Sequence, residues 1–173
     1  TGSVTYNSST KMMNFPGGST GTAYGTLAGN FDDFSSGVSV DFEGNFGSAV
    51  NSWERIVDFA TGASGTNPGT ANAILVGRYN GNDKIFIEVI RNGSSQGHCY
   101  TSADSALGTT ARWTLTVGTS GGCRIYKNGV AQTVASDATA PASWQPPINT
   151  SRTTNWVGRS NWTGDADLEG QLR

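Results

Sequence analysis

The chain has 173 residues, of which 24 are glycine and 14% are charged, and its formal net charge is −2. This length suits one domain with a two-layer core, and the wealth of Gly, Ser, Thr and Asn is typical of a turn-rich extracellular β domain. Lys and Arg are not gathered into a stripe, which argues against a nucleic-acid partner. No apolar run is long enough for membrane insertion. The chain starts at Thr1, which favours a processed secretory precursor or an excised domain.

Short runs of alternating apolar and polar residues recur along the whole chain, separated by clusters of Gly, Asn, Ser and Pro. In the clearest run, Trp113, Leu115 and Val117 alternate with threonines, as in a strand with one buried face. Asn128-Gly129 supplies the positive φ angles of a two-residue hairpin turn. The strands expected in chain order are 11–15, 23–27, 38–42, 54–59, 73–79, 85–91, 113–117, 124–127, 130–134 and 156–158.

No segment longer than a turn or two shows the helical period, so the chain is predicted to be all-β, an antiparallel two-sheet β-sandwich. Its core is expected to form where the apolar faces of the two sheets meet. The residues expected there are Phe42, Phe59, Ile74, Ile87, Trp113, Leu115 and Ile125.

The order of these segments resembles the laminin-G-like, concanavalin-A-like lectin/glucanase superfamily. In those domains a Trp-led strand precedes an aromatic-x-Asn/Asp-Gly hairpin, a Gly-rich strand and a Gly-hydrophobic strand near the domain end. The matching segments here are 113–117, 123–130, 156–160 and 170–172, with 12–18, 38–43 and 53–59 similar to earlier strands. The resemblance covers nearly the whole chain and implies a jelly roll formed by a single domain, 1–173.

Similar domains continue after the segment matching 170–172 with another strand, so the resemblance implies that a terminal strand is missing here. The open edge is then expected to be covered by the N-terminal segment 1–7, from the same chain or from a neighbouring subunit. Repeated donation between subunits would generate a filament.

The two cysteines, Cys99 and Cys123, lie in neighbouring regions of expected strand. They are either a disulfide or a pair of buried thiols. We expect the disulfide, because the composition points outside the cytoplasm and strand neighbours meet the distance requirement readily.

Candidate catalytic residues are few. Asp41 and Glu43 share the polar face of one strand, and related glucanases carry three acids there as Glu-x-Asp-x-Glu or Glu-x-Asp-x-x-Glu, but the first acid is Ser39 in this chain. A solvated strand face is therefore the expected role of this pair. The single histidine, His98, has no companion at metal or triad spacing and is expected to be an ordinary surface or edge residue.

Aromatic residues within polar loops are the better indication of function, because an exposed ring can stack on a sugar while nearby amides and carboxylates bind its hydroxyls. The alternative is that these rings, Trp144 among them, cap the open ends of the sandwich. The candidate ligand-binding residues are Tyr79, Asn80, Asp83, Arg159, Asn161, Trp162 and Asp165.

Asp165, Asp167 and Glu169 crowd a short turn, where Ca²⁺ could find oxygen ligands; family members often bind calcium at a rim, and solvated turns are the alternative. Asp32-Asp33 is a second acidic loop. Four asparagines match the glycosylation sequon, and Asn92 and Asn149, both in expected turns, are the best acceptors.

The sequence thus predicts a non-catalytic extracellular recognition or adhesion module, with a carbohydrate or glycoprotein as its ligand. The second hypothesis is a structural subunit of an extracellular filament or surface coat, assembled by strand exchange. The third is a glycoside hydrolase.

Overall fold

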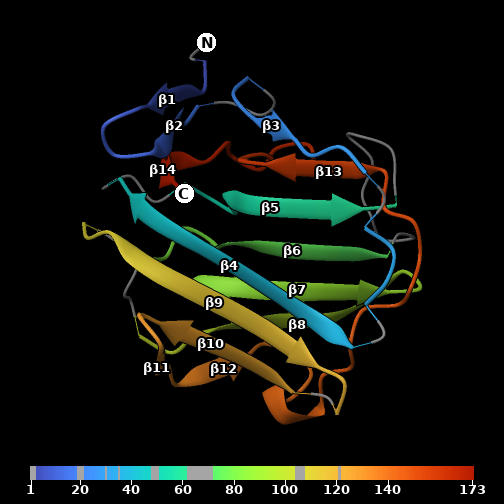
Figure 1. The fold of residues 1–173 in the computed structure, drawn as a ribbon. Coiled ribbons are helices and arrows are strands. Elements are labelled where there is room, and N and C mark those ends of the chain that lie inside the picture. Colours follow the sequence, from blue (N-terminus) through green and yellow to red (C-terminus); the bar gives the residue numbers. More distant parts are fainter. Residues whose placement is uncertain are drawn as a thin grey trace.

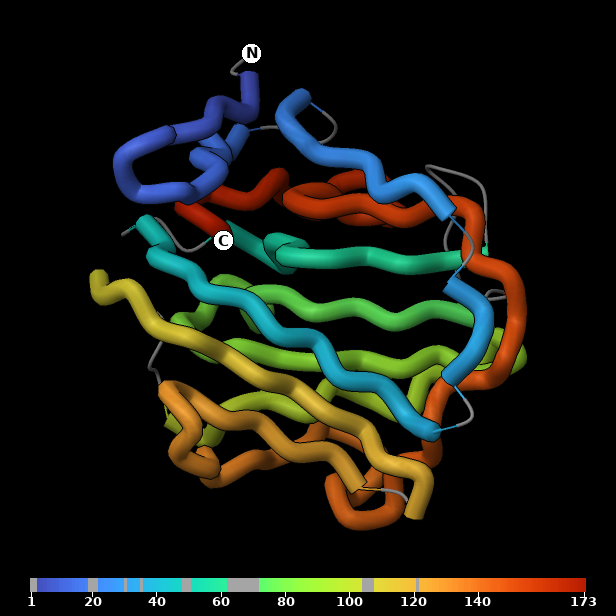
Figure 2. The backbone as a smooth tube through the Cα atoms, viewed as in Figure 1, coloured from blue at the N-terminus to red at the C-terminus, as the bar shows by residue number. Residues whose placement is uncertain are grey.

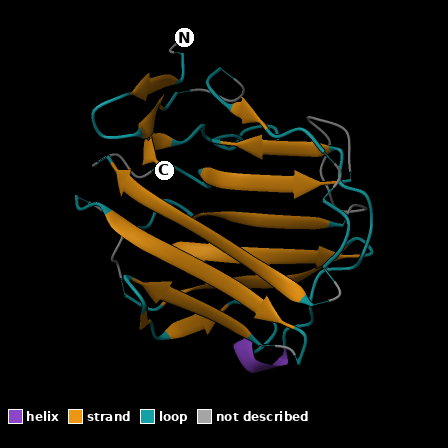
Figure 3. Cartoon of the chain, viewed as in Figure 1, coloured by secondary structure: helices purple, strands orange, loops and turns teal. Residues whose placement is uncertain are grey.

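The protein is a sandwich of two antiparallel sheets that lie face to face (Figure 1). The computed structural model describes residues 3–18, 22–29, 31–34, 36–47, 51–61, 72–103, 108–120 and 122–173. Within these residues the helical structure is one 3₁₀ turn, Pro141–Ser143 (Figure 3), and no helix is long and apolar enough to cross a membrane. The predicted all-β, antiparallel two-sheet β-sandwich is confirmed.

Within the described residues, each sheet has seven strands. Sheet A, in front in Figure 1, has the order β1 (Thr5–Asn7), β2 (Met12–Pro16), β14 (Glu169–Leu172), β4 (Gly37–Phe46), β9 (Ala111–Gly118), β10 (Cys123–Lys127) and β11 (Val130–Ala131). Sheet B has the order β12 (Val134–Ser136), β8 (Ser94–Thr101), β7 (Ile85–Arg91), β6 (Ala73–Arg78), β5 (Arg55–Ala60), β13 (Thr154–Val157) and β3 (Gly25–Thr26).

The core lies between the two sheets and contains every residue expected there. Strand register explains the packing on sheet A, because Phe42 lies opposite Trp113, and Leu115 lies opposite Ile125. Both Trp113 and Leu115 are fully buried. Apolar residues alternate with polar ones along β9, so one face of the strand is dry and the other is polar.

The Asn-Gly turn predicted at Asn128-Gly129 is present, with φ angles of 50° and 78°. Both values are positive, as a type I′ hairpin turn requires. The Asn128 side chain also accepts a hydrogen bond from the backbone N–H of Arg112, at 2.9 Å. The Asn-Gly turn therefore sets the register in which β11 pairs with β10.

Cys99 and Cys123 form the expected disulfide, with Cα atoms 6.6 Å apart. The two cysteines are not neighbours within one sheet, however. Cys99 lies on β8 of sheet B and Cys123 on β10 of sheet A, and both are part of the core. The bond therefore ties the two layers together.

One strand prediction was wrong and another was incomplete. The expected strand 130–134 is divided into β11 and β12, which belong to different sheets, so the chain crosses the sandwich within it. Strand β8 was expected only as a strand region near Cys99 and without bounds, because Ser94–Thr101 is polar and contains a glycine, Gly97.

The two ends of the chain lie in the same sheet, sheet A, as the tube in Figure 2 shows. Strand β14 lies between β2 and β4, and β1 pairs with β2 of its own chain. The N-terminal segment thus adds an edge strand to sheet A, within its described part, and assembly between subunits stays a prediction.

Replacing Trp113 by Ala should lower the free energy of unfolding by about 3 to 5 kcal/mol, because the indole is fully buried and leaves a cavity. Urea denaturation measures this loss. The control is Val130→Ala at a side chain that is 64% exposed, where a change within about 0.5 kcal/mol is expected. A loss at Trp113 as small as that of the control would contradict the packing.

The disulfide should make the native chain two hydrogen masses lighter than its reduced form. Closing a loop between residues 24 positions apart should stabilise the fold by about 3 to 4 kcal/mol, lost in the Cys99→Ala/Cys123→Ala variant. Two alkylatable thiols in the native protein would show that the bond is absent.

Candidate functional site

The outer face of sheet B carries a row of polar residues from neighbouring strands. The register places Asp58 of β5 opposite Leu75 of β6, Leu75 opposite Glu88 of β7, and Glu88 opposite His98 of β8. Asp58 and Glu88 are both buried although they face away from the core. Carboxylates are rarely buried without partners, so this face is covered by other groups.

A cluster of aromatic rings covers one side of this row. Phe86 is fully buried, and edge-to-face contacts join its ring to Trp53 at 5.8 Å and to His98 at 5.2 Å between centroids. Trp53 also lies 4.6 Å from His98, and Tyr79 stacks on Tyr100 at 4.2 Å. Together these rings form an apolar wall beside the carboxylates.

Arg55 brings a positive charge into the same cluster. Its side chain forms an ion pair with Asp165 at 3.0 Å, and its guanidinium lies 5.2 Å from the ring centroid of Phe86 and 5.3 Å from that of Trp162. The strand register shifts between Arg55 and Val57, and this bulge directs the Arg55 side chain outward.

Gly77 on β6 lets β5 and β6 approach closely at this bulge. A Cβ atom on Gly77 would collide with the carbonyl oxygen of Glu54, which accepts a hydrogen bond from the Arg78 N–H at 2.9 Å. The Arg55–Gly77–Phe86 row therefore depends on glycine in the middle of a strand.

These groups surround a cavity of about 240 Å³ that opens to solvent on the outer face of sheet B. The lining residues are Trp53, Arg55, Glu88, His98, Trp162 and Asp165. Both tryptophans are half-buried, whereas Trp113 and Trp144 are fully buried elsewhere. The cavity thus combines apolar ring surfaces with charged and hydrogen-bonding groups.

His98 lies between two carboxylates. Its Nδ1 is 2.8 Å from Asp137, and its Nε2 is 3.4 Å from Glu88, which also accepts a hydrogen bond from the Ser95 hydroxyl at 2.6 Å. Burial acts to lower the pKa of His98, but the two carboxylates outweigh burial and raise the pKa above its ordinary value. The expectation that His98 is an ordinary surface or edge residue was wrong.

Two further acids of the cluster also titrate unusually. Burial raises the pKa of Asp58 to about 6, against the opposing influence of Arg55 and of hydrogen bonds from Asn161. Burial likewise raises the pKa of Asp165, which is bonded by Arg55 and by the Ser160 hydroxyl. Perturbed carboxylates of this kind are more frequent at functional sites than elsewhere.

The predicted ligand-binding residues divide into two sets. Trp162 and Asp165 line the cavity, and Tyr79 packs against its Trp53 and His98 walls. Asn161 is buried beneath it, bonded through its side chain to Asp58 at 2.6 Å.

The other predicted ligand residues do not line the cavity. Asn80 and Asp83 lie in the turn between β6 and β7. Arg159 instead places its guanidinium 4.1 Å from the ring centroid of Trp156. The structure therefore gathers only part of the predicted set.

The acids proposed for calcium have separate surroundings. Asp165 is paired with Arg55, Asp167 accepts hydrogen bonds from the backbone of Thr22 at 2.8 Å, and Glu169 lies beside a groove on sheet A. Within the described residues, no group of three or more His, Cys, Asp or Glu side chains is placed to hold a metal ion. Calcium binding at these residues stays a prediction.

The two preferred sequons are accessible in different ways. Asn92 is exposed in the β7–β8 turn at a φ of 50°. Asn149 is also exposed, but its side chain accepts a hydrogen bond from the Phe34 N–H at 2.7 Å. Modification of either residue stays a prediction.

The two carboxylates on β4, Asp41 and Glu43, are each paired with an arginine. Arg112 binds Asp41 through two nitrogens, and Arg173 binds Glu43 at 2.8 Å. The Arg112 guanidinium helps to hold the pKa of Asp41 below its ordinary value.

Trp144 has a packing role. Its side chain is fully buried, and its indole N–H donates a hydrogen bond to the Thr139 carbonyl.

Four cavity residues were missed from the sequence: Trp53, Arg55, Glu88 and His98. A signal was present for Glu88, because an acid interrupts an otherwise apolar strand at an outward position. No comparable signal in the sequence indicates the left-handed backbone of Trp53, with a φ of 59°, or the bulge at Arg55.

Comparison with solved structures places this fold among known sandwiches. Domains LG4-5 of the mouse laminin alpha1 chain match 92% of this chain at a TM-score of 0.54 and 11% identity, and the match spans 40% of that fragment. The chain has the concanavalin-A-like, laminin-G-like fold. A native glycosidic hydrolase matches 98% of the chain and 79% of its own length, at a TM-score of 0.51 and 15% identity.

A carbohydrate-binding module, CBM66 from Bacillus subtilis, aligns over 99% of this chain and 87% of its own, with a TM-score of 0.45 and 9% identity. No protein-family model matches the sequence, and no curated protein matches it. At such identities the structural likeness establishes the fold, and function has to be argued from the site.

The Glu88→Gln substitution should lower the pKa of His98, because it removes a carboxylate that favours the imidazolium. The chain has one histidine, so NMR titration of the imidazole protons is unambiguous. Because the pKa is raised only in the folded state, the stabilisation it provides is full below about pH 6.5 and is lost as pH rises through the raised value. An unchanged or higher pKa in the variant would contradict the contact.

Proposed function

We propose that the cavity on the outer face of sheet B binds a neutral sugar residue of an extracellular glycan, without cleaving it. The observation that carries this proposal is the combination of two half-buried indoles, Trp53 and Trp162, with Arg55, Glu88 and His98 around one opening. A sugar ring has apolar faces that can pack on indoles and hydroxyls that bind carboxylates, imidazole and guanidinium.

The charges around the cavity favour a neutral ligand. Glu88 and Asp165 line it, and both lining basic groups are already paired, Arg55 with Asp165 and His98 with Glu88 and Asp137. A carboxylate or sulfate on the ligand would therefore meet two acids in a partly dry site, where like charges repel strongly. Hydroxyl groups meet no such repulsion and can donate to these carboxylates.

Existing contacts also favour recognition over catalysis. Glu88 is held by Ser95 and His98, and Asp165 by Arg55 and Ser160, so both carboxylates are fixed as hydrogen-bond acceptors. Glycoside hydrolysis remains the second candidate, because burial raises the pKa of Asp165 in the direction that a general acid needs.

An extracellular setting fits the disulfide between Cys99 and Cys123, since such bonds persist in oxidising compartments. Adhesion through a glycoprotein ligand is the corresponding biological role. Self-assembly is a weaker alternative, because the described part of the N-terminal segment already pairs with its own β2.

Replacing Trp162 by Ala should weaken glycan binding about tenfold or more, which is about 1.4 kcal/mol. Ligands would first be found on a glycan array, and affinities then measured by calorimetry. Tyr6→Ala, at a 61% exposed aromatic on the edge of sheet A, is the matched control and should leave the affinity unchanged. Full affinity in Trp162→Ala and in Trp53→Ala would exclude this cavity.

The same ligands serve to separate binding from hydrolysis. Incubation with the wild-type protein should release no sugar. Cleavage that disappears in Asp165→Asn or in Glu88→Gln, but persists in the Asp41→Asn/Glu43→Gln variant altered on the opposite sheet, would establish a hydrolase in place of a binding module.

A further inference from the structure

The outer face of sheet A carries a row of side-chain amides that the proposed site does not use. Gln171 on β14 lies opposite Asn14 on β2 and opposite Asn45 on β4. Three adjacent strands therefore present three amides side by side, at cross-strand spacings of about 5 Å.

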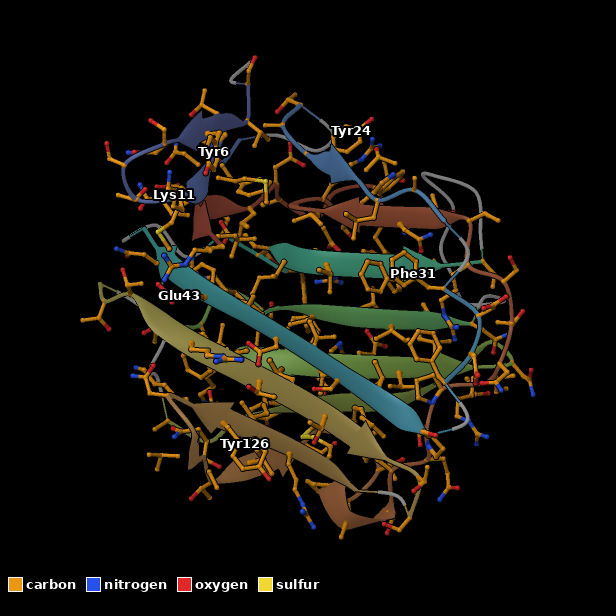
Figure 4. All side chains as sticks on the ribbon, in the orientation of Figure 1. Tyr6, Lys11, Tyr24, Phe31, Glu43 and Tyr126 are labelled. Carbon is orange, nitrogen blue, oxygen red and sulfur yellow. A yellow bond between two sulfur atoms is a disulfide. The ribbon has the colours of Figure 1, made fainter. Side chains whose placement is uncertain are left out.

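These amides point away from the core. Their strand neighbours Phe15, Phe46 and Leu172 are buried between the sheets, and successive side chains of a strand lie on opposite faces. Glu43, labelled on β4 in Figure 4, is on the same outer face two residues before Asn45. The amide row thus faces the side opposite the cavity of sheet B.

A groove of about 360 Å³ runs over this row. Asn14, Asn45 and Gln171 are half-buried in its walls, and among the described residues their side chains form no hydrogen bond or ion pair with one another or with other groups. Each amide offers two donor hydrogens and one acceptor oxygen, so the row can both donate hydrogen bonds to hydroxyl groups and accept them.

Glu169 adds a carboxylate to the groove, in a position that two glycines allow. A Cβ atom on Gly47 would lie 2.7 Å from Oε1 of Glu169, and one on Gly17 would lie 3.0 Å from its Cβ. Gly17 also has a φ of 72°, which other residues adopt with strain. Any larger residue at either glycine would displace the carboxylate.

We propose that this groove is a second binding site, for a small neutral molecule rich in hydroxyl groups, such as one sugar unit. Its volume suits a small organic ligand, and its one lining carboxylate is too few for a calcium site that relies on several acidic ligands. With no indole in the lining to stack on a ring, binding is expected in the millimolar range, about −4 kcal/mol.

Together with the site proposed on sheet B, on which this point rests, the groove lets one molecule hold two ligand units at once, because the two lie on opposite sheets. This property distinguishes the protein from a single-site module, because two weak sites on one polymer or surface act together through their effective concentration.

The test is NMR titration of ¹⁵N-labelled protein with the methyl glycosides of glucose, galactose, mannose and N-acetylglucosamine, and separately with calcium chloride. The side-chain NH₂ signals of Asn14, Asn45 and Gln171 should shift saturably with at least one glycoside. Gln171→Ala should weaken this binding about two- to tenfold, as the loss of one or two hydrogen bonds requires. Gln132→Ala, at a residue that follows β11 at the other edge of sheet A, is the control.

Titration in the Trp162→Ala background separates this site from the cavity on sheet B. If the amide signals still shift there, the groove binds by itself, whatever becomes of the first site. Asn14→Ala, at the partner position on β2, gives a second variant should Gln171→Ala fail to fold. Amide signals that stay unmoved by every glycoside, or that respond to calcium alone, would overturn the proposal.

Discussion

The ion pair between Arg55 and Asp165 is the constraint on which the outer face of sheet B depends. It joins the start of β5 to the loop after β13, segments that are 110 residues apart, and both side chains are largely removed from solvent. Breaking a buried pair by removing one partner leaves an uncompensated charge and typically costs about 3 to 5 kcal/mol. The loop that carries Trp162 is therefore anchored by the same charge that lies against the Trp162 ring.

The backbone at Trp53 is strained. Its φ of 59° is in the left-handed region, which costs a bulky residue about 1 to 2 kcal/mol. The Arg55 guanidinium bonds the Trp53 carbonyl at 2.7 Å, and the indole packs on Tyr79 and His98. Backbone strain held in place by side chains is frequent at binding and catalytic sites, which agrees with the function proposed for this cavity.

Much of the fold could be predicted because its signals are local. Alternation identified β9, and the Asn128-Gly129 turn identified the hairpin of β10 and β11. The polar strand β8 gave no such signal. The cavity was predicted only in part, because Trp162 and Asp165 stand in one polar loop, whereas Glu88 and His98 become neighbours only through the register of two strands. Long-range register and a strained turn cannot be read from residue spacing.

A crystal structure of the protein with its best neutral oligosaccharide tests the central claim most directly. The account predicts a sugar ring packed on Trp53 or Trp162, with hydroxyls bonded to Glu88 or Asp165 and the carbohydrate bond intact. A ligand bound elsewhere, with the cavity of sheet B occupied only by water, would contradict it.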